Sequence, residues 1–108
     1  MQIYKPGDII FIRNVKFKDG GIDTRINGHP FVLLEDVIDV GQKVKCLKIT
    51  SQIRSNQIKL GKHFLRKQSY VDLNKVYYLN INSYSFPYES LDIKSNAWLK
   101  KYIDKSED

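Results

Sequence analysis

Residues 29–52 read HPFVLLEDVIDVGQKVKCLKITSQ, and this pattern predicts two antiparallel strands at the centre of a small sheet. The run Phe31–Leu34 is apolar throughout, as expected for a strand that is covered on both faces. In the run Val44–Ile49 two lysines interrupt the apolar residues, so one face of that strand is expected to be half exposed. Gly41, in the polar segment between the runs, supplies the backbone freedom that a hairpin turn needs.

Both predicted strands have polar residues at the end away from this turn. Gly28-His29-Pro30 leads into the first strand, and Thr50-Ser51-Gln52 follows the second. Because the strands are antiparallel, these two ends are expected to lie side by side at one rim of the sheet. The sequence therefore places its candidate functional residues at that rim.

Other apolar runs predict further strands and one helix. β-branched and aromatic residues favour strands at Ile9–Ile12 with Val15, at Ser69–Leu73 and at Val76–Ile81, with a turn at Asn74 between the last two. A Pro-Gly turn at residues 6–7 precedes the first strand. After residue 93 the apolar residues follow helical spacing, which predicts an amphipathic helix over the sheet and a frayed end at residues 106–108.

Glycine-rich and polar segments predict loops at residues 16–27 and 83–87. Taken together, the pattern predicts one domain over residues 1–108. Its fold class is mainly β: an antiparallel sheet curled into a small barrel, with a C-terminal α-helix packed on it.

The charge of the chain favours certain classes of binding partner but does not identify one of them. Eighteen Lys and Arg residues against twelve Asp and Glu residues give a net charge of +6. A basic surface favours RNA, DNA, an anionic membrane or an acidic peptide, although many small basic proteins bind no nucleic acid. The N-terminus has no signal-peptide pattern and no apolar run reaches membrane-spanning length, which predicts a cytoplasmic protein without a membrane partner.

Metal and thiol chemistry have little support in this sequence. Cys46 is the single cysteine, so the chain has no internal disulfide, and its apolar surroundings favour a buried thiol over a nucleophile. His29 and His63 have no other ligands at metal-binding spacing. Phosphate-binding and dinucleotide-binding loops are absent as well, so we expect no metal and no cofactor.

The polar rim contains the groups that RNA cleavage requires. That reaction needs a base for the 2′-hydroxyl proton, a cation or donor facing the phosphorane, and an acid for the leaving oxygen. His29 serves as base or acid near neutrality, Arg25 binds phosphate through paired hydrogen bonds, and the Thr50 hydroxyl donates to the phosphate. Residues expected to contact RNA nearby are Ser51, Gln52, Arg54, Lys18 and Asp23.

Each of these residues also has an ordinary structural explanation. His29 before Pro30 is compatible with an exposed loop, and Thr50 with Ser51 is compatible with a plain strand end. Arg25 and Arg54 fit solvated loop cations, and Asp23 fits a turn. The residues alone leave both interpretations open.

The order of motifs resembles the MazF/PemK family of toxin–antitoxin ribonucleases. Members of that family open with Pro-Gly-Asp before a strand, and this chain has PGDII at residues 6–10. A Gly-containing loop then leads into GHPFVLL at residues 28–34, and ITS follows at residues 49–51. The segment LRKQSYVDL at residues 65–73 is similar to a later stretch of the family, so the resemblance extends from residue 4 to about residue 79.

This resemblance implies an SH3-type barrel of the kind that MazF, PemK and CcdB share. It also implies a homodimer, metal-independent endoribonuclease activity on single-stranded mRNA at short sequences, and inhibition by an acidic antitoxin. The threonine that follows the third strand in the family matches Thr50. The family has Arg directly before the proline of the second strand, whereas this chain has His29, so either His29 takes over with Arg25 or the activity is altered or lost.

Two non-catalytic functions therefore stand beside the nuclease. A relative of this fold traps DNA gyrase through its C-terminal helix, and here Trp98, Lys100 and Lys101 would form that contact surface unless Trp98 belongs to the core. A degenerate relative would instead bind RNA or a protein without cutting. The replacement of the family arginine by His29 favours this second alternative.

Overall fold

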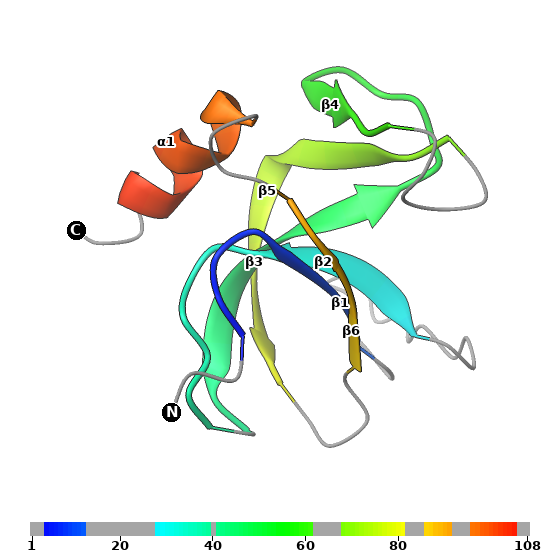
Figure 1. The fold of residues 1–108 in the computed structure, drawn as a ribbon. Helices are drawn as coiled ribbons and strands as arrows, with labels where there is room; N and C mark the ends of the chain where they lie inside the picture. The colour runs from blue at the N-terminus through cyan, green and yellow to red at the C-terminus, as the bar shows by residue number, and fades with distance from the viewer. Residues whose placement is uncertain are drawn as a thin grey trace.

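The computed structural model describes residues 4–12, 28–39, 41–61, 68–81, 86–91 and 96–105. Within these ranges the chain forms six strands and one helix, in the order β1 (Asp8–Ile12), β2 (His29–Leu33), β3 (Lys43–Thr50), β4 (Gln57–Lys59), β5 (Tyr70–Asn80), β6 (Phe86–Ser90) and α1 (Ala97–Lys105) (Figure 1). The predicted mainly β class is confirmed. Val15, the predicted loop 16–27 and the predicted frayed end 106–108 lie outside the described residues.

All six strands belong to one antiparallel sheet with the order β4-β5-β3-β2-β1-β6. β2 pairs with β3 from Phe31 opposite Lys48 to Leu33 opposite Cys46, which confirms the predicted central pair of antiparallel strands. β5 lies between β3 and β4, although β3 and β4 follow each other along the chain. This insertion pairs residues that are distant in sequence, such as Thr50 with Tyr70, 20 positions further along the chain.

The sheet is strongly bent but open (Figure 1). In the described part of the chain β4 pairs only with β5, and β6 pairs only with β1, so the sheet keeps two edges. Closure into a barrel would require hydrogen bonds between these edge strands. The structure therefore shows the antiparallel sheet and the C-terminal helix, and it does not show the closed barrel.

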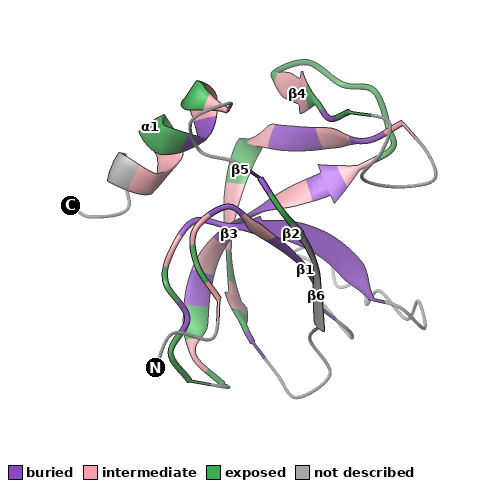
Figure 2. Ribbon diagram, viewed as in Figure 1, coloured by how far each residue is buried: buried purple, intermediate pink, exposed green. Residues whose placement is uncertain are grey.

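Two hydrophobic cores lie on opposite faces of the sheet. The helix-side core consists of Ile9, Val32, Leu34, Leu47, Ile49, Leu60, Val71, Leu91 and Leu99. The far core consists of Ile10, Ile12, Phe31, Leu33, Val37, Val44, Cys46 and Ile81. Successive strand residues point to opposite faces, and a core covers each face of β2. Every residue of β2 is therefore buried, as Figure 2 shows. The prediction of a strand covered on both faces is confirmed.

The structure corrects the predicted turn at Asn74. β5 is one continuous strand through this position, where the backbone nitrogen and Nδ2 of Asn74 donate to Asp72 Oδ1 at 2.9 and 2.7 Å. Nδ2 also donates to the carbonyl of Ser55 at 2.9 Å. Against β3 the register shifts here, because Ile49 faces Val71 and Leu47 faces Val76. The asparagine thus supports an irregularity within a long strand and does not end it.

The structure also differs from the sequence analysis in two segments, one predicted to be a loop and one to which no element was assigned. Phe86 and Pro87, at the end of the predicted loop 83–87, belong to β6, which is an edge strand and so tolerates a proline. Gln57–Lys59 forms β4, which the polar sequence did not suggest. The predicted amphipathic helix is confirmed as α1, and Leu99 is its fully buried residue in the helix-side core.

We expect Gly41→Ala to lower the free energy of unfolding by about 1 kcal/mol. Gly41 has φ of +93°, which L-residues rarely adopt, while an added Cβ would meet no atom within 4 Å. The loss therefore comes from backbone strain and not from a clash. Gly61→Ala is the matched control, since its Cβ would also meet nothing within 4 Å and its φ is not positive. Urea denaturation of both variants measures the difference, and equal stabilities would contradict this explanation.

Candidate functional site

The strand register places His29, Lys48 and Thr50 on one face of the sheet. His29 and Phe31 are two residues apart in β2, and Phe31 lies opposite Lys48 in β3. Thr50 follows Lys48 by two residues, so it returns to the same face. Phe31 belongs to the far core, whereas α1 packs against the other core. The candidate face is thus the one away from α1.

His29 and Thr50 occupy the same end of the β2–β3 pair without pairing to each other. The paired residues end at Phe31–Lys48, two positions before His29 would face Thr50. Beyond this point the two strands diverge, as the cyan and green ribbons on the right of Figure 1 show. The two polar ends therefore share one end and one face of the sheet, as predicted. The strands separate there, so the two ends are not paired side by side as expected.

His29 is a buried residue of β2, which rules out the alternative of an exposed loop histidine. Only 6% of its surface is exposed, and its ring centroid lies 5.1 Å from that of Phe31. Phe31 in turn contacts Tyr77 of β5 edge-on at 5.9 Å, and the Lys75 ammonium lies 4.5 Å from the Tyr77 ring centroid. A row of rings thus connects the imidazole to a lysine at the edge of the far core.

The loop after β3 is held by its own hydrogen bonds. Thr50 Oγ1 accepts a hydrogen bond from the backbone nitrogen of Gln52 at 3.1 Å. Gln52 Oε1 accepts one from Arg54 Nη2 at 3.0 Å, and the Gln52 carbonyl accepts one from Gln57 Nε2 at 2.9 Å. Ser51, Gln52 and Arg54 are all exposed. Arg54 is therefore a surface cation whose guanidinium is held in place by Gln52.

Three predicted site residues fall outside the described part of the chain. Lys18, Asp23 and Arg25 belong to the segment 13–27. Their roles as RNA contacts, and that of Arg25 as a catalytic cation, stay predictions.

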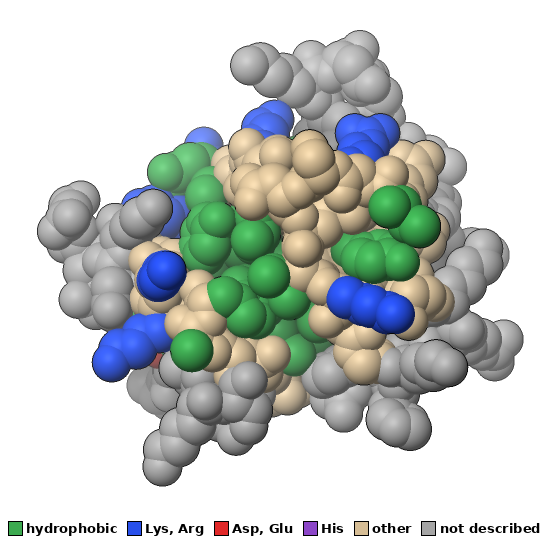
Figure 3. All heavy atoms as spheres, turned by 90° about the horizontal axis from the view of Figure 1, so that it is seen from above, with side chains coloured by type: hydrophobic (Ala, Val, Ile, Leu, Met, Phe, Trp, Pro, Cys, Tyr) green, Lys and Arg blue, Asp and Glu red, His purple; other side chains and the backbone are tan. Residues whose placement is uncertain are grey.

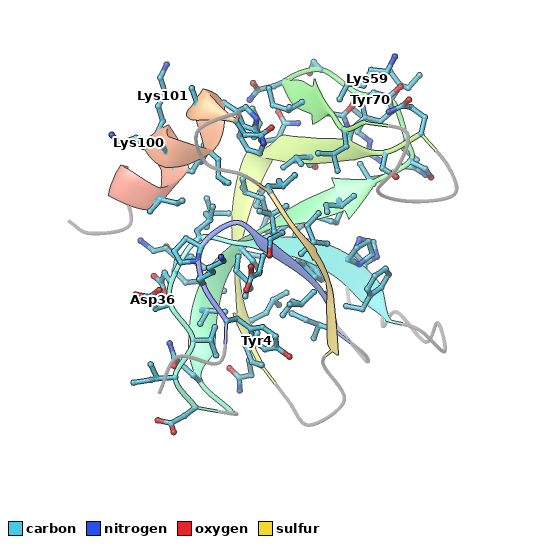
Figure 4. The ribbon with its side chains drawn as sticks, in the orientation of Figure 1. Tyr4, Asp36, Lys59, Tyr70, Lys100 and Lys101 are labelled. Atoms are coloured by element: carbon cyan, nitrogen blue, oxygen red, sulfur yellow. The ribbon has the colours of Figure 1, made fainter. Side chains whose placement is uncertain are left out.

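Sequence reasoning missed two residues that the sheet places beside Thr50. Thr50 lies opposite Tyr70 of β5, and Tyr70 lies opposite Lys59 of β4. Directly opposed residues of antiparallel strands point to the same face, so the three side chains form a hydroxyl–phenol–ammonium row. Lys59 and Tyr70 are adjacent on the right-hand side of Figure 4. No local pattern could have found this row, because its members come from three strands that are distant in sequence.

Cys46 is a structural residue, as the sequence suggested. It is fully buried, its Sγ lies 3.7 Å from the carbonyl oxygen of Tyr77, and burial raises the pKa of its thiol, with a smaller contribution from Glu35. A thiol held in the protonated form is a poor nucleophile.

The raised pKa of Cys46 gives a pH prediction. The ordinary thiol pKa is 9.0, so above pH 9 the unfolded chain releases a proton that the folded chain retains. This contribution to stability is complete below pH 9 and is lost as the pH rises above it. We expect the free energy of unfolding of the wild type to fall more steeply between pH 8.5 and 10.5 than that of Cys46→Ala, with the pH range set by the ordinary pKa. Identical slopes in urea titrations would contradict the assignment.

α1 carries exposed lysines and a partly buried tryptophan. Lys100 and Lys101 are exposed and point away from the sheet (Figure 4), whereas Trp98 packs against the helix-side core. Ile58 and Leu73 are also partly buried at this core. Seen from the end of the molecule that carries α1 and β4, apolar side chains form a band with Lys and Arg at its margins (Figure 3). The packing of Trp98 against the core supports its interpretation as a core residue.

The fold defines the chain as a mainly β protein. On one face of its sheet, strands β2, β3, β4 and β5 bring together the candidate residues His29, Lys48, Thr50, Tyr70 and Lys59, and we call this region the polar corner. No protein-family model matches the chain, and neither a curated protein nor a solved structure is significantly similar to it. Among the described residues no helix combines the length and the apolar character needed to cross a membrane. The described ranges also contain no group of three or more His, Cys, Asp or Glu residues that could hold a metal ion.

Proposed function

We propose that this protein is a metal-independent endoribonuclease toxin of the MazF/PemK kind, built on that family's SH3-type barrel, that cleaves single-stranded mRNA. The observation that carries the proposal is the common face and common strand end of His29, Lys48 and Thr50. The motif order described above and the net charge of +6 support it further. Under this proposal the protein acts in the cytoplasm as a homodimer and is inhibited by an acidic antitoxin.

The proposed reaction assigns a role to each of the candidate catalytic side chains. His29 takes the proton of the 2′-hydroxyl, and the freed oxygen attacks phosphorus as the 5′-oxygen leaves with a proton from water. Lys48 and Arg25 offset the charge on the phosphorane, and the Thr50 hydroxyl donates to its oxygen. Lys48 thereby supplies, from the neighbouring strand, a positive charge that the family has directly before the proline. The products are a 2′,3′-cyclic phosphate and a 5′-hydroxyl.

A second function on the same face is RNA binding without cleavage. It is favoured by the burial of His29, which is only 6% exposed and whose ring packs against Phe31. A general base must reach the proton that it removes, so an imidazole that stays in this position binds no 2′-hydroxyl. The exposed cations Arg54 and Lys59 would still attract the phosphate backbone.

Incubation of purified protein with mixed-sequence single-stranded RNA in EDTA tests the proposal. Fragments ending in cyclic phosphate and 5′-hydroxyl groups are the result that the nuclease predicts. Intact RNA that remains bound to the protein would overturn the nuclease and support the second function. Intact and unbound RNA would overturn both, and inhibition of gyrase supercoiling in the same preparation would then assign the function to a protein target contacted through Lys100 and Lys101.

A further inference from the structure

The row Thr50–Tyr70–Lys59 offers two hydroxyl donors and a positive charge to a phosphate that approaches it. Its three members are neighbours across β3, β5 and β4, and Lys59 is exposed while Thr50 and Tyr70 are half-buried. Adjacent strands lie about 4.8 Å apart, so the backbones of the three residues span roughly 10 Å. A phosphodiester oxygen accepts hydrogen bonds from hydroxyl, phenol and ammonium groups alike.

The polar groups next to this row are already engaged elsewhere. Asp72 lies two residues beyond Tyr70 on the same face, and its Oδ1 accepts both hydrogen bonds from Asn74. Gln57 lies opposite Asp72; its Nε2 donates to the Gln52 carbonyl and its Oε1 accepts from the Arg54 backbone nitrogen. One oxygen of this carboxylate therefore already accepts two N–H hydrogen bonds, and the Gln57 amide is turned toward the loop.

Arg54 adds a second cation at this corner. Its side chain is exposed and donates from Nη2 to Gln52 Oε1, in the loop that Thr50 Oγ1 holds at its start. Arg54 thus lies within the β3–β4 connection, and Lys59 ends the strand that follows it. Because the loop is already ordered, binding a polyanion here requires little further ordering of the chain.

We infer that Thr50, Tyr70 and Lys59 form a binding site for a backbone phosphate of single-stranded RNA, next to the phosphate that is cleaved. The site rests on the proposed function for the identity of its ligand. Thr50 lies at the junction, where it faces both the cleaved phosphate and the row. Tyr70 and Lys59 bind and position RNA and take no part in proton transfer.

Binding of a non-cleavable 2′-O-methyl oligonucleotide tests the site separately from cleavage. We expect Lys59→Gln to weaken binding about 5- to 10-fold and to lower the slope of log K against log salt by about 0.7, the value for one phosphate contact in a single strand. Tyr70→Phe, which removes only the phenol oxygen, is expected to weaken binding about 3-fold. Lys100→Gln is the matched control, since it removes an equal charge from an exposed position on α1.

The possible outcomes separate this site from the nuclease. Equal effects of Lys59→Gln and Lys100→Gln on affinity and salt slope would overturn the site, whether or not the wild type cleaves RNA. Selective loss in Lys59→Gln without cleavage by the wild type would uphold the site and overturn the nuclease. With an active nuclease, the site also predicts that Lys59→Gln and Tyr70→Phe raise KM and leave kcat unchanged. A fall in kcat alone would assign Lys59 and Tyr70 to the chemical step.

Discussion

Thr50→Val is expected to lower kcat/KM for RNA cleavage by about 10²-fold, because it removes a donor to the developing charge on phosphorus. Valine keeps the β-branched shape that suits the last position of β3. It also removes the oxygen that accepts the Gln52 backbone hydrogen bond, so Thr50→Ser serves as control by keeping the hydroxyl. Steady-state cleavage with a fluorogenic oligonucleotide, next to thermal melts, is the measurement.

The serine variant decides how a loss is interpreted. Near-wild-type cleavage by Thr50→Ser together with loss in Thr50→Val assigns the effect to the hydroxyl. If both variants lose activity equally, the hydroxyl alone does not explain the effect, because serine keeps the hydroxyl and valine keeps the methyl group. Wild-type cleavage by Thr50→Val would remove Thr50 from the proposed reaction.

Phe31→Ala is expected to lower the free energy of unfolding by about 3–5 kcal/mol. Phe31 is fully buried in a strand with a core on each face, and its ring contacts those of His29 and Tyr77. Truncation leaves a cavity at the centre of the far core. Since domains of this size are stable by only about 5–15 kcal/mol, the variant is expected to be close to unfolding at 25 °C.

Ile53→Ala provides the control for this loss. Ile53 is as large and apolar as a core residue, yet it is 79% exposed in the loop after β3, so its removal is expected to change stability by less than about 0.5 kcal/mol. Urea denaturation followed by tryptophan fluorescence compares the two variants. A loss below about 1.5 kcal/mol in Phe31→Ala would mean that the far core rearranges to fill the cavity.

The local sequence pattern was sufficient to predict features that depend on a single strand or a single glycine turn. Four consecutive apolar residues, Phe31–Leu34, identified a strand covered on both faces, since a strand exposed on one face would alternate with polar residues. Gly41 and Gly7 identified turns, and both have positive φ. The same local reasoning failed at Asn74, because an asparagine that typically ends strands here bonds to Asp72 and Ser55 within a continuous one.

The candidate site was only half predictable. His29, Thr50 and Arg54 could be selected because their chemistry is visible in the sequence, and the strand ends brought two of them to one face. Lys48 was not selected as a site residue from the sequence. Its position opposite Phe31 is what places it on the same face as His29 and Thr50. The sequence around His29 did not predict its burial, since histidine before proline is typical of exposed loops.

By itself, the sequence determined which residues of each regular strand face the same side, because the side-chain period of two depends on neighbours along the chain. In β5 the irregularity at Asn74 reverses this alternation, since Leu73 packs at the helix-side core and Leu79 at the far core. Only the tertiary structure decided which strands are adjacent. β5 enters between β3 and β4, and this order brings Tyr70 and Lys59 to Thr50. Strand order depends on how two cores are filled at once by residues far apart in sequence, and no single segment contains that information.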